Sequence, residues 1–106
     1  MKEGFERLLE RYGVAVTHVA KTETIERGIV THVTTEQEIK MILQPLRADE
    51  ILALSEFGVV AGSLKAYAPL DAEINVGDEI VYEGVNYSVV AVETTIAMRK
   101  LILRRL

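Results

Sequence analysis

The feature that most limits the possible folds is the crowding of β-type segments into the last third of the chain. In the stretch VGDEIVYEGVNYSVVAVE, Val76–Glu93, apolar and polar residues alternate around two glycines. We predict three strands in quick order, Asp78–Tyr82, Val85–Glu93 and Arg99–Arg105. Their connections are too short to hold a helix, so neighbouring strands must pair antiparallel. In a chain of 106 residues this pattern favours a small barrel or a tight sandwich.

The two glycines of this stretch are either a ligand cradle or structural turns. Gly84 follows Glu83 between two alternating strands, where a two-residue turn needs a positive φ. Gly77 precedes the acidic pair Asp78-Glu79, and no lysine or helix start follows, as a phosphate-binding loop would require. We therefore interpret Gly77 and Gly84 as structural turns.

The rest of the chain is predicted to supply two helices and three further strands. Apolar residues at i, i+3, i+4 and i+7 predict an N-terminal helix over Glu3–Tyr12. A second, short helix is predicted over Ala48–Phe57, with acids in its first turn and Gly58 at its end. The further strands are Val14–Lys21, Ile39–Gln44 and Ser63–Ala68. We expect one domain, residues 1–106, of the mainly β (α+β) class: a small antiparallel β-barrel with an N-terminal helix, a second short helix and a long projecting loop.

The projecting segment is Thr22–Glu38, which has little apolar content and Gly28 near its middle. Weak β runs on both sides of Gly28 make it either a projecting hairpin or a long mobile loop. Segments of this length in compact domains are usually functional or disordered. The candidate interaction residues on it are Thr22, Glu26, Gly28, His32 and Glu36.

Charge is unevenly spread along the chain. The net charge is -4, and four of the twelve basic residues, Arg99, Lys100, Arg104 and Arg105, lie in the last ten residues. The other 96 residues hold eight basic against sixteen acidic residues, a net charge of -8. An acidic body repels phosphate backbones, which argues against a dedicated nucleic-acid binder. These four basic residues are candidate interaction residues, although the preferred interpretation is a strand whose outward positions are cationic.

Residues that could support catalysis are few. The chain has no cysteine, and its two histidines, His18 and His32, are interpreted as half-buried or surface residues. Adjacent acids such as Asp78-Glu79, interpreted as a solvated turn, point in different directions and make no ready general acid and base. We therefore expect no enzyme, no metal and no cofactor. No run approaches the roughly 20 apolar residues of a membrane span, so no membrane is expected.

The order of elements from Ile39 to Leu106 resembles bacteriophage head-closure proteins, also called head-completion, stopper or head-tail joining proteins. The residues that carry the resemblance are Gln44-Pro45-Leu46, Leu64–Pro69, Gly77-Asp78-Glu79-Ile80, Glu83-Gly84 with Tyr87-Ser88-Val89-Val90, and Leu101–Leu106. The resemblance implies a structural protein of a virion or prophage, a ring of identical subunits that closes the portal channel and joins the tail. It also implies partners: other copies of the chain, a portal or adaptor protein, a tail protein, and DNA only as passing cargo.

The same resemblance implies assembly in the host cytoplasm and a final place at the head-tail junction of the virion. The sequence leaves open whether the isolated chain is a monomer. The alternative function is a small β-barrel binding module for nucleic acid or peptide, and an enzyme comes third. Binding to single-stranded nucleic acid that weakens steeply with salt would favour the binding module.

Overall fold

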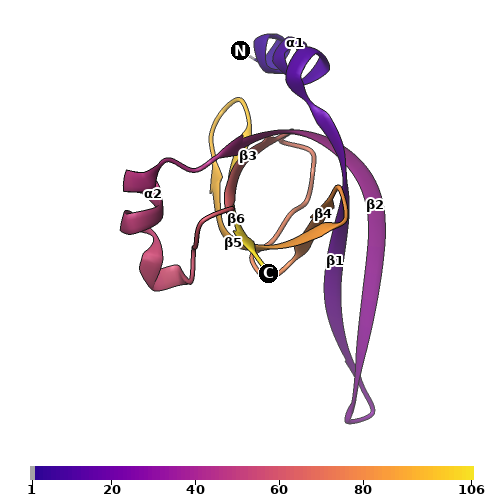
Figure 1. The fold of residues 1–106 in the computed structure, drawn as a ribbon. Helices are drawn as coiled ribbons and strands as arrows, with labels where there is room; N and C mark the ends of the chain where they lie inside the picture. Colours follow the sequence, from indigo (N-terminus) through magenta and orange to yellow (C-terminus); the bar gives the residue numbers. More distant parts are fainter. Residues whose placement is uncertain (1) are drawn as a thin grey trace.

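The computed structural model describes residues 2–106, and its centre is a closed six-stranded antiparallel barrel (Figure 1). In chain order the elements are α1 (Lys2–Tyr12), β1 (Val14–Glu26), β2 (Ile29–Pro45), α2 (Ala48–Ala53), the 3₁₀ turn η1 (Ser55–Phe57), β3 (Leu64–Ala68), β4 (Glu79–Tyr82), β5 (Val85–Thr94) and β6 (Arg99–Arg105). The order around the barrel is β1-β2-β3-β6-β5-β4, and β4 closes it against β1. The predicted fold class is confirmed.

The barrel interior is filled by the inward-facing residues of every strand. Val16, Met41, Ile80, Leu101 and Leu103 are each at most 2% exposed. They alternate along their strands with exposed or half-buried residues, as the period of two predicts. Burial of these side chains is the main favourable contribution to the barrel, since each is worth about 1.5–3 kcal/mol.

Two hairpin turns have the same backbone conformation. The β1–β2 turn is Arg27-Gly28 and the β4–β5 turn is Glu83-Gly84, and all four residues have positive φ, between 50° and 78°. Positive φ at both central residues is the requirement of a type I′ hairpin turn, whose twist matches that of the strands. Gly77, in the loop before β4, has a φ of 98° and donates its N–H to the carbonyl of Val89 at 2.9 Å.

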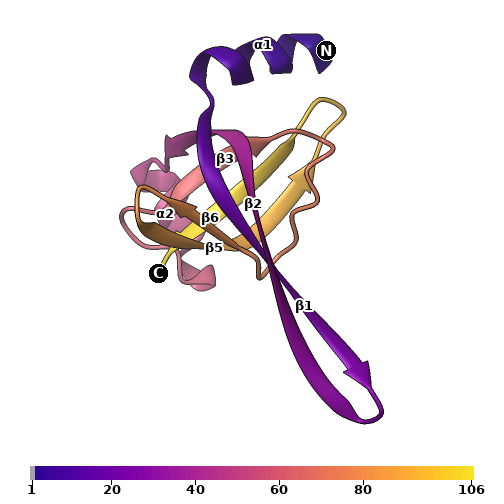
Figure 2. The ribbon, with the colours of Figure 1, turned by 90° about the vertical axis from the view of Figure 1, so that its right-hand side faces the viewer.

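The segment predicted as a projecting hairpin or a mobile loop is a hairpin. β1 extends five residues beyond the predicted end at Lys21, and β2 begins ten residues before the predicted start at Ile39. The strands pair without interruption from Val14↔Met41 to Glu26↔Ile29, and their far end projects from the barrel (Figures 1 and 2). Threonine, valine and isoleucine sustain this pairing outside the core, because β-branched residues favour extended backbone. We call residues 21–38 the arm.

The second helix differs from the prediction of one helix over Ala48–Phe57. The α-helix α2 ends at Ala53, and η1 follows as a separate 3₁₀ turn. The Ser55 hydroxyl donates to the Leu52 carbonyl at 2.9 Å, and Leu54 leaves the helical conformation. Serine near a helix end competes in this way with the backbone, which explains the break. No helix within residues 2–106 is both long and apolar enough to cross a membrane.

Candidate interaction surfaces

The arm is exposed over its whole length and has open strand edges. Every residue from 21 to 38 is exposed. β4 covers β1 only over Thr17–Val19, and β3 covers β2 only over Ile42–Pro45. Beyond those contacts each strand of the arm has one edge without a strand partner, a surface that can accept other polypeptide.

The two faces of the arm differ in chemistry. Opposite residues in an antiparallel pair share a face, so the face that continues the barrel interior can be read from the register. We call it the threonine face; it consists of Thr22, Thr24, Glu26, Ile29, Thr31, Val33, Thr35 and Gln37. The opposite, charged face consists of Lys21, Glu23, Ile25, Val30, His32, Thr34, Glu36 and Glu38. The threonine face has a single charge, at Glu26 beside the turn.

The arm residues predicted from the sequence lie together on this hairpin but not on one face. Thr22 and Glu26 belong to the threonine face, His32 and Glu36 to the charged face, and Gly28 to the turn. A single partner surface laid against one face of the arm cannot contact all four side chains of this set.

The base of the arm is fixed by a buried polar contact that was not predicted from the sequence. His18 is 1% exposed and Asp78 is 4% exposed, so the expectations of a half-buried or surface histidine and a solvated acidic turn are both wrong. His18 Nε2 lies 2.8 Å from Asp78 Oδ2, and Gln37 Nε2 lies 3.2 Å from His18 Nδ1. Because the glutamine amide nitrogen can only donate, Nδ1 accepts and the ring donates its Nε2 proton to Asp78.

Asp78 also organises its own loop. The same Oδ2 atom accepts the backbone N–H of Asn75 at 2.9 Å, and the Asp78 carbonyl accepts from Val89 at 2.9 Å. Lys21 and Glu79 add an ion pair of 3.2 Å between β1 and β4 at the barrel surface. The alternation of Val14, Val16 and His18 was a local signal that the histidine is buried. Its partner Asp78 is sixty residues away along the chain, so no local signal in the sequence indicates the contact between them.

The four basic residues of β6 do not form one patch. Arg99 and Arg105 share one side of the strand and Lys100 and Arg104 the other, as its alternation requires. Arg99 donates to the Leu70 carbonyl at 3.2 Å, and Arg104 and Arg105 lie against Gly58 and Gly62 respectively. Lys100 lines a small cleft between α2 and the outer side of β5 and β6. The three arginine side chains therefore pack against loops of the same chain.

Helix α2 is held to the barrel by an ion pair. Lys65 Nζ on β3 lies 3.2 Å from Glu50 Oε1, and both side chains are more than four-fifths buried. The backbone N–H of Arg47 donates to Glu50 at 3.0 Å, and together with Lys65 it holds the pKa of Glu50 below its ordinary value of 4.5. Glu50 thus accepts a backbone hydrogen bond at the start of α2 and also links the helix to β3 through Lys65.

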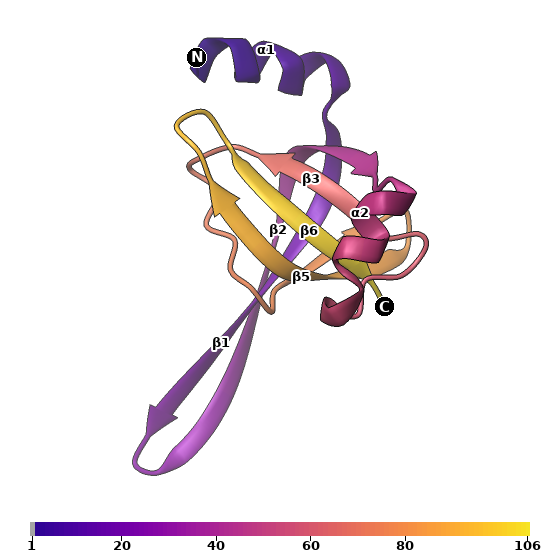
Figure 3. The same ribbon diagram turned by 90° about the vertical axis from the view of Figure 1, so that its left-hand side faces the viewer.

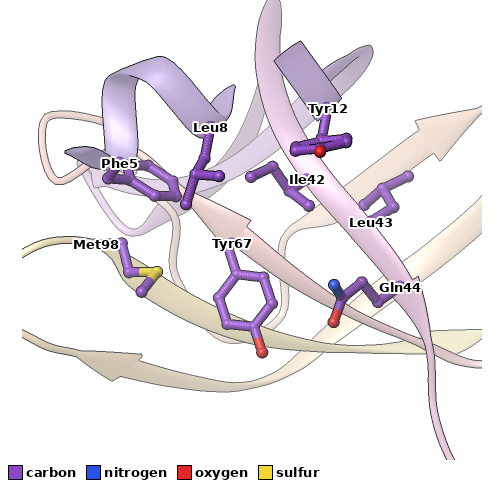
Figure 4. Close-up of a pocket in the computed structure, with 8 residues that line it drawn as sticks. All are labelled: Phe5, Leu8, Tyr12, Ile42, Leu43, Gln44, Tyr67 and Met98. Atoms are coloured by element: carbon purple, nitrogen blue, oxygen red, sulfur yellow. The ribbon is translucent and has the colours of Figure 1, made fainter. Parts of the chain in front are cut away.

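An apolar groove lies between α1 and the barrel end (Figure 4). Its volume is about 630 Å³, and it is lined by Phe5, Leu8, Tyr12, Ile42, Leu43, Gln44, Tyr67 and Met98. Phe5 is buried against the barrel, but Leu8 and Tyr12 are 50% and 57% exposed. Within residues 2–106 no three His, Asp or Glu side chains gather as metal ligands would. The arm and this groove both leave apolar side chains exposed, so they are the candidate interaction surfaces.

These features define a class of fold: a small closed antiparallel barrel with an N-terminal helix and a long projecting hairpin. The solved structures that are similar to it include the following two. The phage-like element PBSX protein xkdH from Bacillus subtilis has a TM-score of 0.59 and 14% identity, over 88% of this chain and 93% of that one. Protein SF1141 from Shigella flexneri 2a has a TM-score of 0.63 and 13% identity, over 86% of this chain and 88% of that one.

At these identities the likeness shows a shared fold, and the first of the two proteins comes from a phage-like element. That origin agrees with the resemblance to phage head-closure proteins found in the sequence. No protein-family model and no curated protein matches the chain.

Proposed function

We propose that this protein is a structural subunit of a virion or prophage that assembles as a ring at the head-tail connector, closes the portal channel and joins the tail. The observation that carries the proposal is the fold shared with a phage-like element protein over 88% of this chain. The sequence points to the same class independently, through the motif order from Gln44 to Leu106.

The distribution of surface and buried groups supports an assembly role. The arm extends apolar side chains into solvent, with Ile25 at 71% and Ile29 at 67% exposed, and the groove beneath α1 leaves Leu8 and Tyr12 half covered. Exposed apolar surface of this kind is typical of sites that contact other proteins. His18, the buried histidine, has both ring nitrogens engaged in contacts that hold the arm. In this proposal the role of His18 is structural.

The partners that follow from this proposal are other copies of the chain, a portal or adaptor protein above the ring and a tail protein below it. DNA passes through the ring as cargo, and an acidic body suits a wall that DNA must not adhere to. The subunit assembles in the host cytoplasm and ends at the head-tail junction of the virion.

The direct test is capture of the chain by its cognate portal and adaptor complex, viewed by electron microscopy. We expect a ring of additional density at the end of the adaptor. The matched control is a shortened-arm variant in which residues 23–32 are replaced by Asn-Gly, the sequence preferred in a type I′ turn, so that Thr22 and Val33 close the new turn as Glu26 and Ile29 close the native one. Absence of bound density at saturating concentration of the intact chain would refute the proposal. Retention of single-stranded DNA that weakens steeply with salt would favour the binding module instead.

A further inference from the structure

The arm is built for contact on one face. A two-stranded hairpin without further packing is marginally stable in water. On the threonine face, Ile29 and Val33 are 67% and 47% exposed, and the neighbouring side chains are threonines. Such a strip of β-branched residues with a single charge at its tip resembles the inner face of a packed sheet. A surface that covers it would stabilise the arm.

The groove beneath α1 has the complementary chemistry. Its volume of about 630 Å³ is in the range of pockets that enclose a ligand, roughly 300–1,000 Å³. Leu8, Ile42 and Met98 give it an apolar lining, while Tyr12, Tyr67 and Gln44 bring hydroxyl and amide groups (Figure 4). Threonine side chains present a methyl and a hydroxyl together, so they can pack on this lining and hydrogen-bond to those polar groups. The charged face would have to bury Glu23 without an opposite charge in the lining, which is costly, whereas the one charge of the threonine face, Glu26, lies beside the turn at the tip.

The groove cannot be filled by the arm of the same chain. Figures 1, 2 and 3 place α1 and the arm tip at opposite ends of a molecule whose longest dimension is 46 Å. A second copy can supply the arm.

Face-to-face stacking of two arms is the competing arrangement between copies. Seven residues per strand give a face about 24 Å long and 10 Å wide, from the rise and spacing of strands. That is roughly 240 Å² per copy, against about 800 Å² in a standard interface. Stacking of two arms alone therefore falls well short of a standard interface.

We propose that the arm of one copy docks by its threonine face in the groove between α1 and the barrel of the next copy. This contact deepens the proposed ring and rests on it for the presence of adjacent copies. It joins unlike surfaces head to tail, and such contacts form a closed ring when the rotation between copies closes. Each copy gives one arm and receives one arm.

Disulfide cross-linking tests the contact in the full chain, because the native sequence contains no cysteine. One preparation carries Leu8→Cys in the groove, and a second, distinguishable by mass, carries Thr31→Cys on the threonine face. The matched control is His32→Cys, one residue further along the same exposed strand but on the charged face. We expect the Leu8–Thr31 pair to give at least about fivefold more cross-linked heterodimer than the Leu8–His32 pair, both in concentrated solution and on the portal and adaptor complex.

Each result separates the contact from the proposed function. Equal yields for Thr31 and His32, or a dominant homodimer of Thr31→Cys alone, would overturn the arm-to-groove contact. Rings in micrographs without the Leu8–Thr31 cross-link would overturn the contact and leave the ring standing. The cross-link in solution without any ring on the portal and adaptor complex would support the contact and contradict the proposed function at the head-tail connector. Neither rings nor cross-link would overturn both.

Discussion

Replacement of Asp78 by alanine removes the acceptor that joins the base of the arm to the loop before β4. One carboxylate oxygen, Oδ2, accepts from His18 Nε2 at 2.8 Å and from the Asn75 backbone N–H at 2.9 Å. A hydrogen bond to a charged group contributes about 1.5–3 kcal/mol, and a buried donor left without a partner has a cost of its own. His18, at 1% exposed, has no access to water that could replace the carboxylate.

We therefore expect Asp78→Ala to lower the free energy of unfolding by about 3–5 kcal/mol. At roughly 4–8 °C per kcal/mol for a domain near this size, the melting temperature should fall by at least about 12 °C. Asp78→Asn keeps an oxygen in the place of Oδ2 and loses only the charge, so its cost should be about 1 kcal/mol.

The measurement is urea unfolding at pH 7 followed by circular dichroism, with exposed Asp71→Ala as the matched control. The control should change stability by no more than about 0.5 kcal/mol. A double-mutant cycle with His18→Ala isolates the pairwise contact, because the two residues share one hydrogen bond. If Asp78→Ala costs no more than Asp71→Ala, or the cycle shows no coupling, the assignment of a stabilising buried contact is wrong.

Four further predictions follow from other parts of the molecule. The pKa of Glu50 is lowered first by the Arg47 backbone N–H and then by Lys65, so the contribution of the ionised Glu50 to folding stability is complete above pH 4.5 and is lost as the pH falls through the lowered pKa. Lys65→Met should raise the pKa of Glu50 toward 4.5 in an NMR titration. An unchanged pKa would contradict the ion pair. Met41→Ala, at a site that is 0% exposed, should cost about 2–5 kcal/mol in urea unfolding. Gly77→Ala should cost about 1–2 kcal/mol through its φ of 98° alone, since no atom lies within 4 Å of an added Cβ; a neutral substitution would show that the loop relaxes. The shortened-arm variant should melt within about 4 °C of the intact chain, because the arm adds nothing to the core, while its capture by the portal and adaptor complex is lost.

The sequence predicted the barrel well because its strands carry their own signals. Alternation from Val85 to Glu93 and the Glu83-Gly84 turn are local features, and local features decide register in a hairpin. The extent of β1 and β2 was not predictable in the same way. Thr22 and Thr31 have β propensity but no burial to produce an apolar alternation, so the same pattern also suited a mobile loop.

The interaction surfaces were predicted by segment and not by face. Assigning Thr22 to one face and His32 to the other requires the pairing register, which the chain reveals only once the Arg27-Gly28 turn is placed. The contact between His18 and Asp78 links residues sixty positions apart, and the groove under α1 depends on how far the helix stands from the barrel. Such features arise from the assembled fold and leave no mark on a short stretch of sequence.

The continuity of β1 and β2 from the barrel wall to the tip has a mechanical consequence. Neither strand contains a glycine or a proline between Val14 and Glu26 or between Ile29 and Gln44, so the chain has no hinge there. A load at the tip is therefore transmitted as a bending moment to the short β1–β4 pairing over Thr17–Val19. A partner bound at the tip of the arm therefore exerts a torque about the barrel wall, and this torque acts on the whole subunit.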